Sequence, residues 1–136
     1  MLSLDEKFEG VLFGLAAQLK EYQLSWHLNR ALGVELKRAE DIEIIHKKKS
    51  KTSVFSFYRF EDDLNKWNVY VVSNKHSGDF LIPEARHVDY FLMIKGEISM
   101  EQEKELTGKL KAMPVIQLVI PMDYNRLKSK DNLIVE

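Results

Sequence analysis

The sequence has no cysteine, no excess of one charge sign and no long hydrophobic run. The absence of cysteine excludes disulfides, thiolate metal ligands and a cysteine nucleophile. Its 20 basic and 21 acidic residues nearly cancel, so the composition does not favour wholesale binding to nucleic acid. Apolar stretches such as residues 11–17 and 69–72 are too short to span a bilayer. Because Asp5, Glu6 and Glu9 interrupt the N-terminus, we expect no signal peptide, no membrane span and a cytoplasmic location.

The length and apolar content of the chain fit one folded domain. Its 136 residues are 45% apolar, which is enough to fill a hydrophobic core at a typical domain size. We find no internal repeat and no low-complexity linker. The sequence therefore predicts a single domain over residues 1–136.

Six segments have the pattern of β-strands. Residues 52–60 are rich in β-branched and aromatic side chains, and residues 66–73 alternate between apolar and polar ones. Residues 34–46 alternate in part, which indicates one strand, bent or broken near Glu40, before a hairpin tip at residues 47–51. The other expected strands are residues 8–17, for which a helical start is the alternative, 88–95 and 115–120, with a short edge strand at 132–136.

Two segments have the period of an amphipathic helix. Residues 18–32 predict a helix with a broad buried face and a left-handed C-cap at Gly33. The apolar rows of this face are Leu15, Leu19, Tyr22 and Trp26, and Leu24, Leu28, Ala31 and Leu32. The second helix is expected to begin at Ser99, where Gln102 completes a capping box, and to stop at Pro114. Its predicted buried residues are Leu106, Leu110 and Met113.

The order of these elements predicts an α+β fold. Runs of strands beside two helices indicate one antiparallel or mixed sheet of about five to six strands, with both helices packed on one face. The nearest simple topology is a ferredoxin-like arrangement with an inserted hairpin.

The strand at residues 53–60 carries aromatic residues at the spacing used by RNA-recognition domains. Phe55, Phe57 and Phe60 stand at the third, fifth and eighth positions of that strand. The match is partial, because Ser53 and Val54 replace the basic residue and the glycine of the pattern. An RNA-binding module would use Phe55 and Phe57 for stacking and the nearby lysines for phosphates. These lysines are Lys47, Lys48, Lys49 and Lys51, for which a solvated loop is the alternative.

No motif in the sequence indicates a cofactor, a metal or a defined reaction. The chain lacks a phosphate-binding loop, a dinucleotide-binding glycine pattern and a nucleophile elbow. His27, His46, His76 and His87 form no closely spaced metal pair, and the acidic cluster at residues 61–63 has the pattern of a solvated turn. We therefore expect no metal and no cofactor, and the sequence favours a protein that is not an enzyme.

Residues 82–92, IPEARHVDYFL, carry a resemblance to a known family. They resemble the IPExxxVDY family of small bacterial proteins, with all named motif positions present: Ile82, Pro83, Glu84, Val88, Asp89 and Tyr90. The resemblance extends to residues 19–22, Trp26, Asn29, residues 73–75 and residues 127–130. It implies a bacterial, cytoplasmic protein and supplies no mechanism.

The motif has two physical interpretations. As a structural joint, it anchors residues 74–87 against a central strand, with partners required for the Asp89 carboxylate and the Tyr90 hydroxyl if they are buried. As a recognition or catalytic site, it would use Glu84, His87, Asp89 and Tyr90 together.

Three functions remain as hypotheses from the sequence. The first is a non-enzymatic adaptor that binds an unidentified protein or forms a homodimer through an open sheet edge. The candidate contacts are residues 47–51, 82–87 and 125–133. The second is RNA binding through the aromatic strand, and the third is small-molecule binding or catalysis around residues 82–90.

Overall fold

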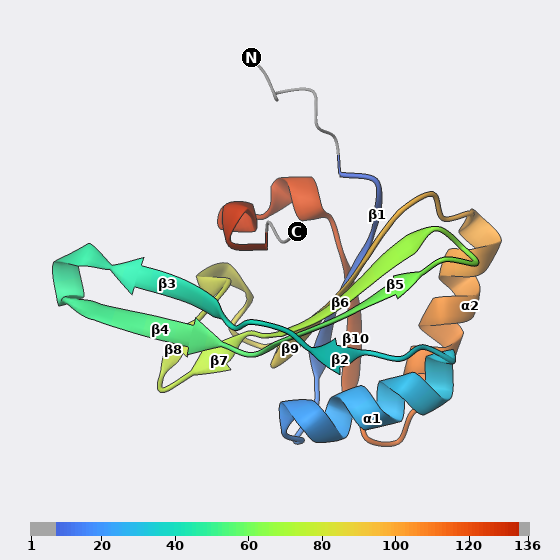
Figure 1. Ribbon diagram of the computed structural model, residues 1–136, viewed down its shortest axis with the longest axis horizontal. Helices are drawn as coiled ribbons and strands as arrows, with labels where there is room; N and C mark the ends of the chain where they lie inside the picture. Colours follow the sequence, from blue (N-terminus) through green and yellow to red (C-terminus); the bar gives the residue numbers. More distant parts are fainter. Residues whose placement is uncertain (1–7, 134–136) are drawn as a thin grey trace, which may run out of the picture.

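A six-stranded antiparallel sheet forms the centre of the protein in the computed structural model, which describes residues 8–133 (Figure 1). The strands follow the order β10 (Leu118–Met122), β1 (Gly10–Ala16), β9 (Tyr90–Lys95), β6 (Trp67–Ser73), β5 (Phe57–Asp62) and β2 (Lys37–Arg38). The helices α1 (Glu21–Leu32) and α2 (Met100–Lys111) pack on one face. The expected α+β fold, with both helices on one face, is confirmed, and of the two sheet types left open by the sequence the structure has the antiparallel one.

The sheet is buried on both faces. Alternate residues of each central strand point to opposite sides, so β1 sends Phe13 toward the helices and Leu12 toward the other face. The helix side is filled by residues such as Leu24 and Leu28 of α1 and Leu106 of α2. The second face is covered by short turns and loops, whose buried side chains are Leu81, Ile82, Ala85, Val88 and Leu133.

Two glycines of β1 leave room for close neighbours. A Cβ on Gly10 would lie 2.0 Å from the Ile94 carbonyl oxygen. A Cβ on Gly14 would lie 2.7 Å from the side chain of Met122 and 2.8 Å from that of Val88. Larger residues at these positions would push apart the two strands or the turn that covers them.

The strand predictions are correct at the centre of the sheet and less accurate at its margins. The strands expected at residues 8–17, 66–73 and 88–95 are confirmed, and β9 lies in the middle. The single strand expected at residues 52–60 is wrong, because the chain divides at Ser56 into β4 (Lys51–Phe55) and β5. The strand expected at 115–120 is confirmed from Leu118 onward, but its core position is wrong, since β10 lies at the edge of the sheet.

The β3–β4 hairpin forms a two-stranded arm that extends away from the main sheet (Figure 1). The expected break near Glu40 is confirmed, because β2 and β3 (Ile42–His46) belong to different sheets. The predicted tip is a short 3₁₀ turn over Lys47–Lys49, followed by Ser50 in the left-handed region with φ of 51°. A small hairpin of β7 (Lys75–His76) and β8 (Asp79–Phe80) contacts β4.

The C-cap of α1 and the capping box of α2 agree with the sequence, but α1 begins at Glu21 and not at residue 18, and its orientation differs. Gly33 is the left-handed C-cap of α1, and Ser99 and Gln102 form the capping box of α2. The prediction that Tyr22 and Trp26 are buried is wrong, because the helix begins at Glu21 and turns Leu24 and Leu28 toward the sheet.

The C-terminal part of the described chain contains no strand after β10. Lys130–Leu133 form a 3₁₀ turn, so the edge strand expected at 132–136 is wrong for its first two residues, and the rest lies outside the described residues. The ferredoxin-like topology stays a prediction. In the structure, α1 is followed by β2 at the far edge of the main sheet, and the chain then forms the β3–β4 arm. Neither helix within residues 8–133 has the length and apolar character needed to cross a bilayer.

Candidate functional site

Asn74 joins the motif segment to the end of β6. Its side chain is fully buried, and its Nδ2 donates to the carbonyl oxygens of Ala85 at 2.9 Å and Val88 at 3.0 Å. Its Oδ1 accepts the Ile82 N–H at 2.8 Å. The Asn74 main-chain N–H donates to the Asp89 carbonyl oxygen, and the Asn74 carbonyl oxygen accepts the Leu81 N–H. One side chain thus satisfies the polar groups of a turn that has no regular secondary-structure partners.

Glu84 links the motif to the C-terminal segment. Its two carboxylate oxygens accept the Ser129 main-chain N–H at 2.7 Å and the Ser129 hydroxyl at 2.9 Å. Desolvation alone would raise the pKa of Glu84, but these hydrogen bonds outweigh it and lower the pKa below its ordinary value. Glu84 is therefore held as a carboxylate that ties two segments together.

Tyr90 begins β9, Asp89 directly precedes it, and both residues connect β9 to the segment before α1. One Asp89 oxygen accepts the Ala17 N–H at 2.9 Å, and the other lies 2.5 Å from Lys75 Nζ. The Tyr90 hydroxyl donates to the Leu19 carbonyl oxygen. Burial, followed by the charges of Glu21 and Asp89, raises the pKa of Tyr90 to about 12. The phenol therefore stays protonated near neutral pH and acts as a hydrogen-bond donor.

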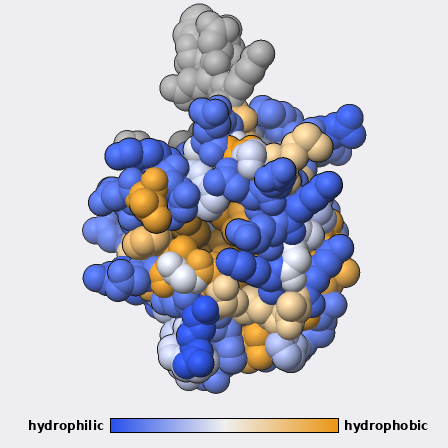
Figure 2. Space-filling model, turned by 90° about the vertical axis from the view of Figure 1, so that its right-hand side faces the viewer, coloured by the Kyte–Doolittle hydropathy of each residue, from blue (hydrophilic) through white to orange (hydrophobic). Residues whose placement is uncertain are grey.

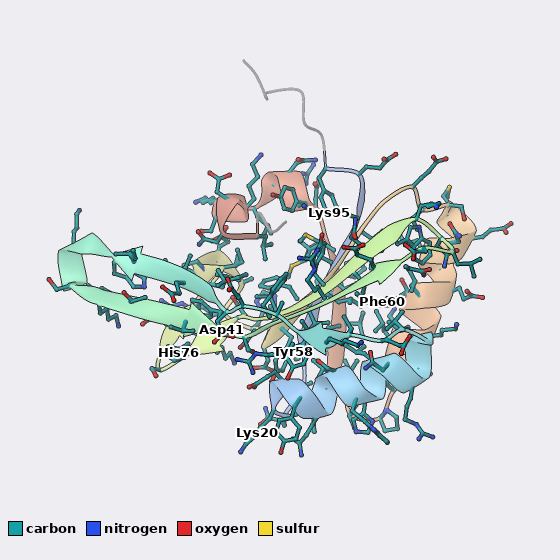
Figure 3. The ribbon with its side chains drawn as sticks, in the orientation of Figure 1. Lys20, Asp41, Tyr58, Phe60, His76 and Lys95 are labelled. Atoms are coloured by element: carbon teal, nitrogen blue, oxygen red, sulfur yellow. The ribbon has the colours of Figure 1, made fainter. Side chains whose placement is uncertain are left out.

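A shallow depression of about 500 Å³ brings Asp89 and Tyr90 together with the start of α1. Its lining residues are Ala17, Gln18, Leu19, Lys20, Glu21, Gln23, Ser73, Lys75, Asp89 and Tyr90. Lys20 lies at its border, at the start of α1 (Figure 3). Glu84 and His87 do not line it, so the four motif residues proposed for chemistry are not brought to one place.

The aromatic strand cannot serve as a stacking platform. Phe55 is 1% exposed and Phe57 is 5% exposed, because both pack into the core on the second face of the sheet. RNA bases need an accessible ring face, so the RNA-binding role predicted for Phe55 and Phe57 is wrong. Lys48, Lys49 and Lys51 are exposed at the arm, whereas the side chain of Lys47 lies outside the described residues.

A serine, a histidine and an aspartate meet on the arm in an order unsuited to nucleophilic catalysis. The Ser53 hydroxyl donates to Asp79 at 2.8 Å and lies 3.0 Å from His46 Nε2. In a catalytic triad the histidine stands between the other two, and the serine is accessible. Here Ser53 is buried, and Lys51 Nζ lies 2.7 Å from Asp79. The Lys51 and Ser53 contacts lower the pKa of Asp79 to about 2. These contacts connect β8 to β4 and have a structural role.

Sequence reasoning missed an aromatic surface on the outer side of α1. Tyr22 is 58% exposed and Trp26 is 55% exposed, and the Arg30 guanidinium lies 4.9 Å from the centre of the Trp26 ring. The three residues are spaced four apart, so they form one stripe along the helix. Their spacing was visible in the sequence, but periodicity alone does not say which apolar row faces the sheet.

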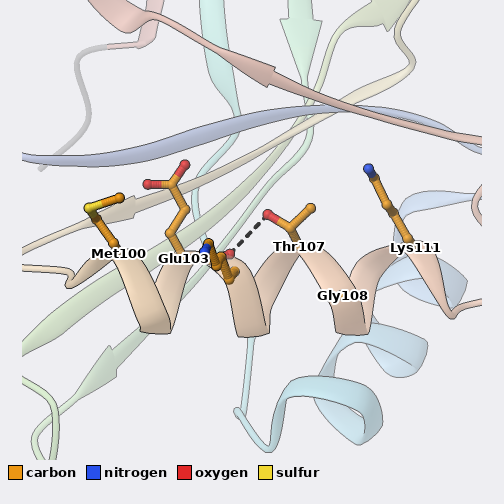
Figure 4. Close-up of a pocket in the computed structure, with 6 residues that line it drawn as sticks. Met100, Glu103, Thr107, Gly108 and Lys111 are labelled. Atoms are coloured by element: carbon orange, nitrogen blue, oxygen red, sulfur yellow. Dashed lines mark hydrogen bonds between the residues drawn. The ribbon is translucent and has the colours of Figure 1, made fainter.

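Two other depressions lie around α2 and gather no reactive cluster. One, of about 450 Å³, is lined by α2 residues including Met100, Glu103 and Lys111; the Thr107 hydroxyl there donates to the Glu103 carbonyl oxygen (Figure 4). The other, of about 190 Å³, lies between α1, the β5–β6 turn and α2, on a face where hydrophilic side chains surround apolar ones (Figure 2). Among residues 8–133, no three histidine or acidic side chains are grouped as metal ligands.

Comparison of the chain with protein-family models, with curated proteins and with solved structures finds no match. The candidate site therefore stands on the geometry of this chain alone. That geometry offers one exposed aromatic surface, formed by Tyr22, Trp26 and Arg30, and a motif whose polar groups bond to neighbouring segments of the same chain.

Proposed function

We propose that this protein is a non-enzymatic binding module that recognises another protein through Tyr22, Trp26 and Arg30 of α1. The observation that carries the proposal is the exposure of two large aromatic rings one helical turn apart, with Arg30 stacked on one of them. Tyrosine, tryptophan and arginine are the residue types that most often dominate binding energy at protein interfaces. A matching partner surface has an apolar pocket for the Trp26 ring and a carboxylate for Arg30.

The motif supports this function as scaffold. Tyr90 and Asp89 bond the Leu19 carbonyl and the Ala17 N–H, which holds the segment that enters α1 against β9. A rigid base reduces the entropy lost when a surface helix binds. The family resemblance of residues 82–92 adds no mechanism, so the proposal rests on the α1 surface.

The test is capture of partners from a lysate of the source organism by tagged wild type, Trp26→Ala and Tyr22→Ala. Leu64→Ala is the matched control, because Leu64 is 90% exposed on the β5–β6 turn. We expect a protein that survives ribonuclease and binds the Leu64→Ala variant normally, but binds the α1 variants at least about tenfold more weakly. Equal capture by all variants would refute the α1 surface. Capture lost with ribonuclease and with Lys48→Glu would instead favour an RNA contact at the arm.

A further inference from the structure

The outer edge of β3 is an unpaired strand edge. Within residues 8–133, β3 pairs with β4 alone, and the arm has no third strand. The two edges of the main sheet are protected, since β10 contains Pro121 and β2 has only two residues, and β4 contacts the β7–β8 hairpin. Ile45 of β3 is 69% exposed. A two-stranded ribbon is marginal in water, so an added strand would stabilise this arm.

Charge is ordered along β3 from acidic to basic. Glu40 and Asp41 precede the strand at the base of the arm, where Figure 3 labels Asp41. Lys48 and Lys49 follow it at the tip. All four side chains are exposed, and Asp41 also pairs with Arg38 of the same chain at 2.6 Å, so Glu40 is the main carboxylate for a partner. A segment with acidic residues at one end and basic residues at the other is complementary to itself when two copies run in opposite directions.

We propose that the partner of this edge is a second copy of the chain, paired antiparallel through β3 about a two-fold axis at Ile44. The two arms then form a continuous four-stranded sheet in the order β4, β3, β3 of the second copy and β4 of the second copy. This register sets Ile42 opposite His46 of the second copy and brings Glu40 beside the second copy's Lys48. The acidic residues before β3 of each copy then lie next to the basic turn of the other copy, so opposite charges meet at both ends of the paired strands.

Alternative pairings are less favourable. A parallel arrangement sets lysine against lysine and carboxylate against carboxylate. Moving the axis to Glu43 sets two carboxylates opposite each other, and moving it to Ile45 leaves only part of each strand paired. The axis at Ile44 pairs all of Ile42–His46. Lys48 and Lys49 discourage pairing of β3 with unrelated strand edges, but they favour pairing with β3 of a second copy.

Charge reversal tests the proposal through the mass of the protein in solution. One variant carries Glu40→Lys and Asp41→Lys, and another carries Lys48→Glu and Lys49→Glu. Glu61→Lys with Asp63→Lys, at the end of β5 and in the turn after it, is the control with the same charge change as the first. By sedimentation we expect wild type and control at twice the 15.9 kDa chain mass. Each arm variant alone should dimerise at least about tenfold more weakly, and an equimolar mixture of the two should dimerise again.

The mixture separates loss of pairing from loss of folding, because a damaged arm would not recover when the variants are combined. A wild type that stays monomeric at about 100 µM, or a mixture that does not recover, would overturn the proposal. A dimer that persists in both arm variants would also overturn it.

A cysteine at the axis tests the register in the full chain, which has no other cysteine. Opposed strand residues are close enough for a disulfide, so oxidised Ile44→Cys should form a covalent dimer. Thr52→Cys, on β4, should not. Cross-linking of both variants, or of neither, would contradict pairing through β3. The arm and α1 lie in different parts of the molecule (Figure 1), so this proposal and the α1 surface can fail separately.

Discussion

At the scale of single residues, the motif is built from polar side chains that each satisfy a specific main-chain group. The Asn74 side chain hydrogen-bonds main-chain groups of Ile82, Ala85 and Val88. The Asp89 side chain accepts the Ala17 N–H. Buried main-chain groups without partners cost about 1–3 kcal/mol each, so these bonds determine the path of the turn. The motif therefore shapes the surface near α1.

Replacing Asn74 with alanine should destabilise the protein by about 3 kcal/mol or more, because three buried main-chain groups lose their partner. Urea unfolding followed by circular dichroism measures the loss. Asn125→Ala is the control, since Asn125 is exposed, and should change stability by less than about 0.5 kcal/mol. Equal stability of both variants would show that the Asn74 bonds are replaceable by water.

At the scale of elements, the arm is fastened to the body through β8. Asp79 accepts the Ser53 hydroxyl and pairs with Lys51, and its pKa of about 2 lies below the ordinary value of 3.8. A lowered carboxyl pKa means that the folded state favours the ionised group. The stabilisation is therefore complete above about pH 4 and is lost as the pH falls toward 2.

Asp79→Asn should lower the unfolding temperature at pH 6, and the difference from wild type should shrink steadily as the pH falls from 4 to 2. The reason is that the folded-state carboxyl, with a pKa of about 2, becomes protonated as the pH approaches that value. Thermal unfolding across this pH range provides the measurement, with Asp123→Asn as a control on an exposed turn. If the difference in unfolding temperature stays constant down to pH 2, the charge of the Asp79 carboxylate does not hold β8 against β4.

At the scale of the whole molecule, the two faces of the sheet are covered differently. The helices cover one face, whereas the motif turn and the C-terminal segment cover the other. Asn132 donates to the Leu81 carbonyl oxygen at 2.7 Å, and Leu133 is fully buried beside the motif. Residues more than 40 positions apart thus complete one core layer.

Leu133→Ala should cost about 2–5 kcal/mol of stability and expose apolar surface on the second face. Chemical unfolding measures the first effect and binding of a hydrophobic dye measures the second. Leu64→Ala removes the same atoms from a residue that is 90% exposed and should be nearly neutral. A neutral Leu133→Ala would show that the C-terminal segment is not part of the core.

Sequence reasoning succeeded where neighbouring residues decide the structure. The helix ends depend on Gly33, Ser99 and Gln102, which act on main-chain groups within one turn. The central strands β6 and β9 follow from local side-chain patterns that are independent of distant contacts. The motif was found from its residues, but its partners were not, because the Glu84 bond to Ser129 spans 45 positions.

The sequence by itself determined the α+β class, the central strands β6 and β9, the C-cap of α1 and the capping box of α2. Only the tertiary structure decided that Phe55 and Phe57 are buried while Tyr22 and Trp26 are exposed. The physical reason is that burial depends on which surfaces meet, and the same apolar pattern fits either side of an element until its neighbours are placed. The break at Ser56, which separates the arm from the sheet, arises in the same way from pairing with distant strands.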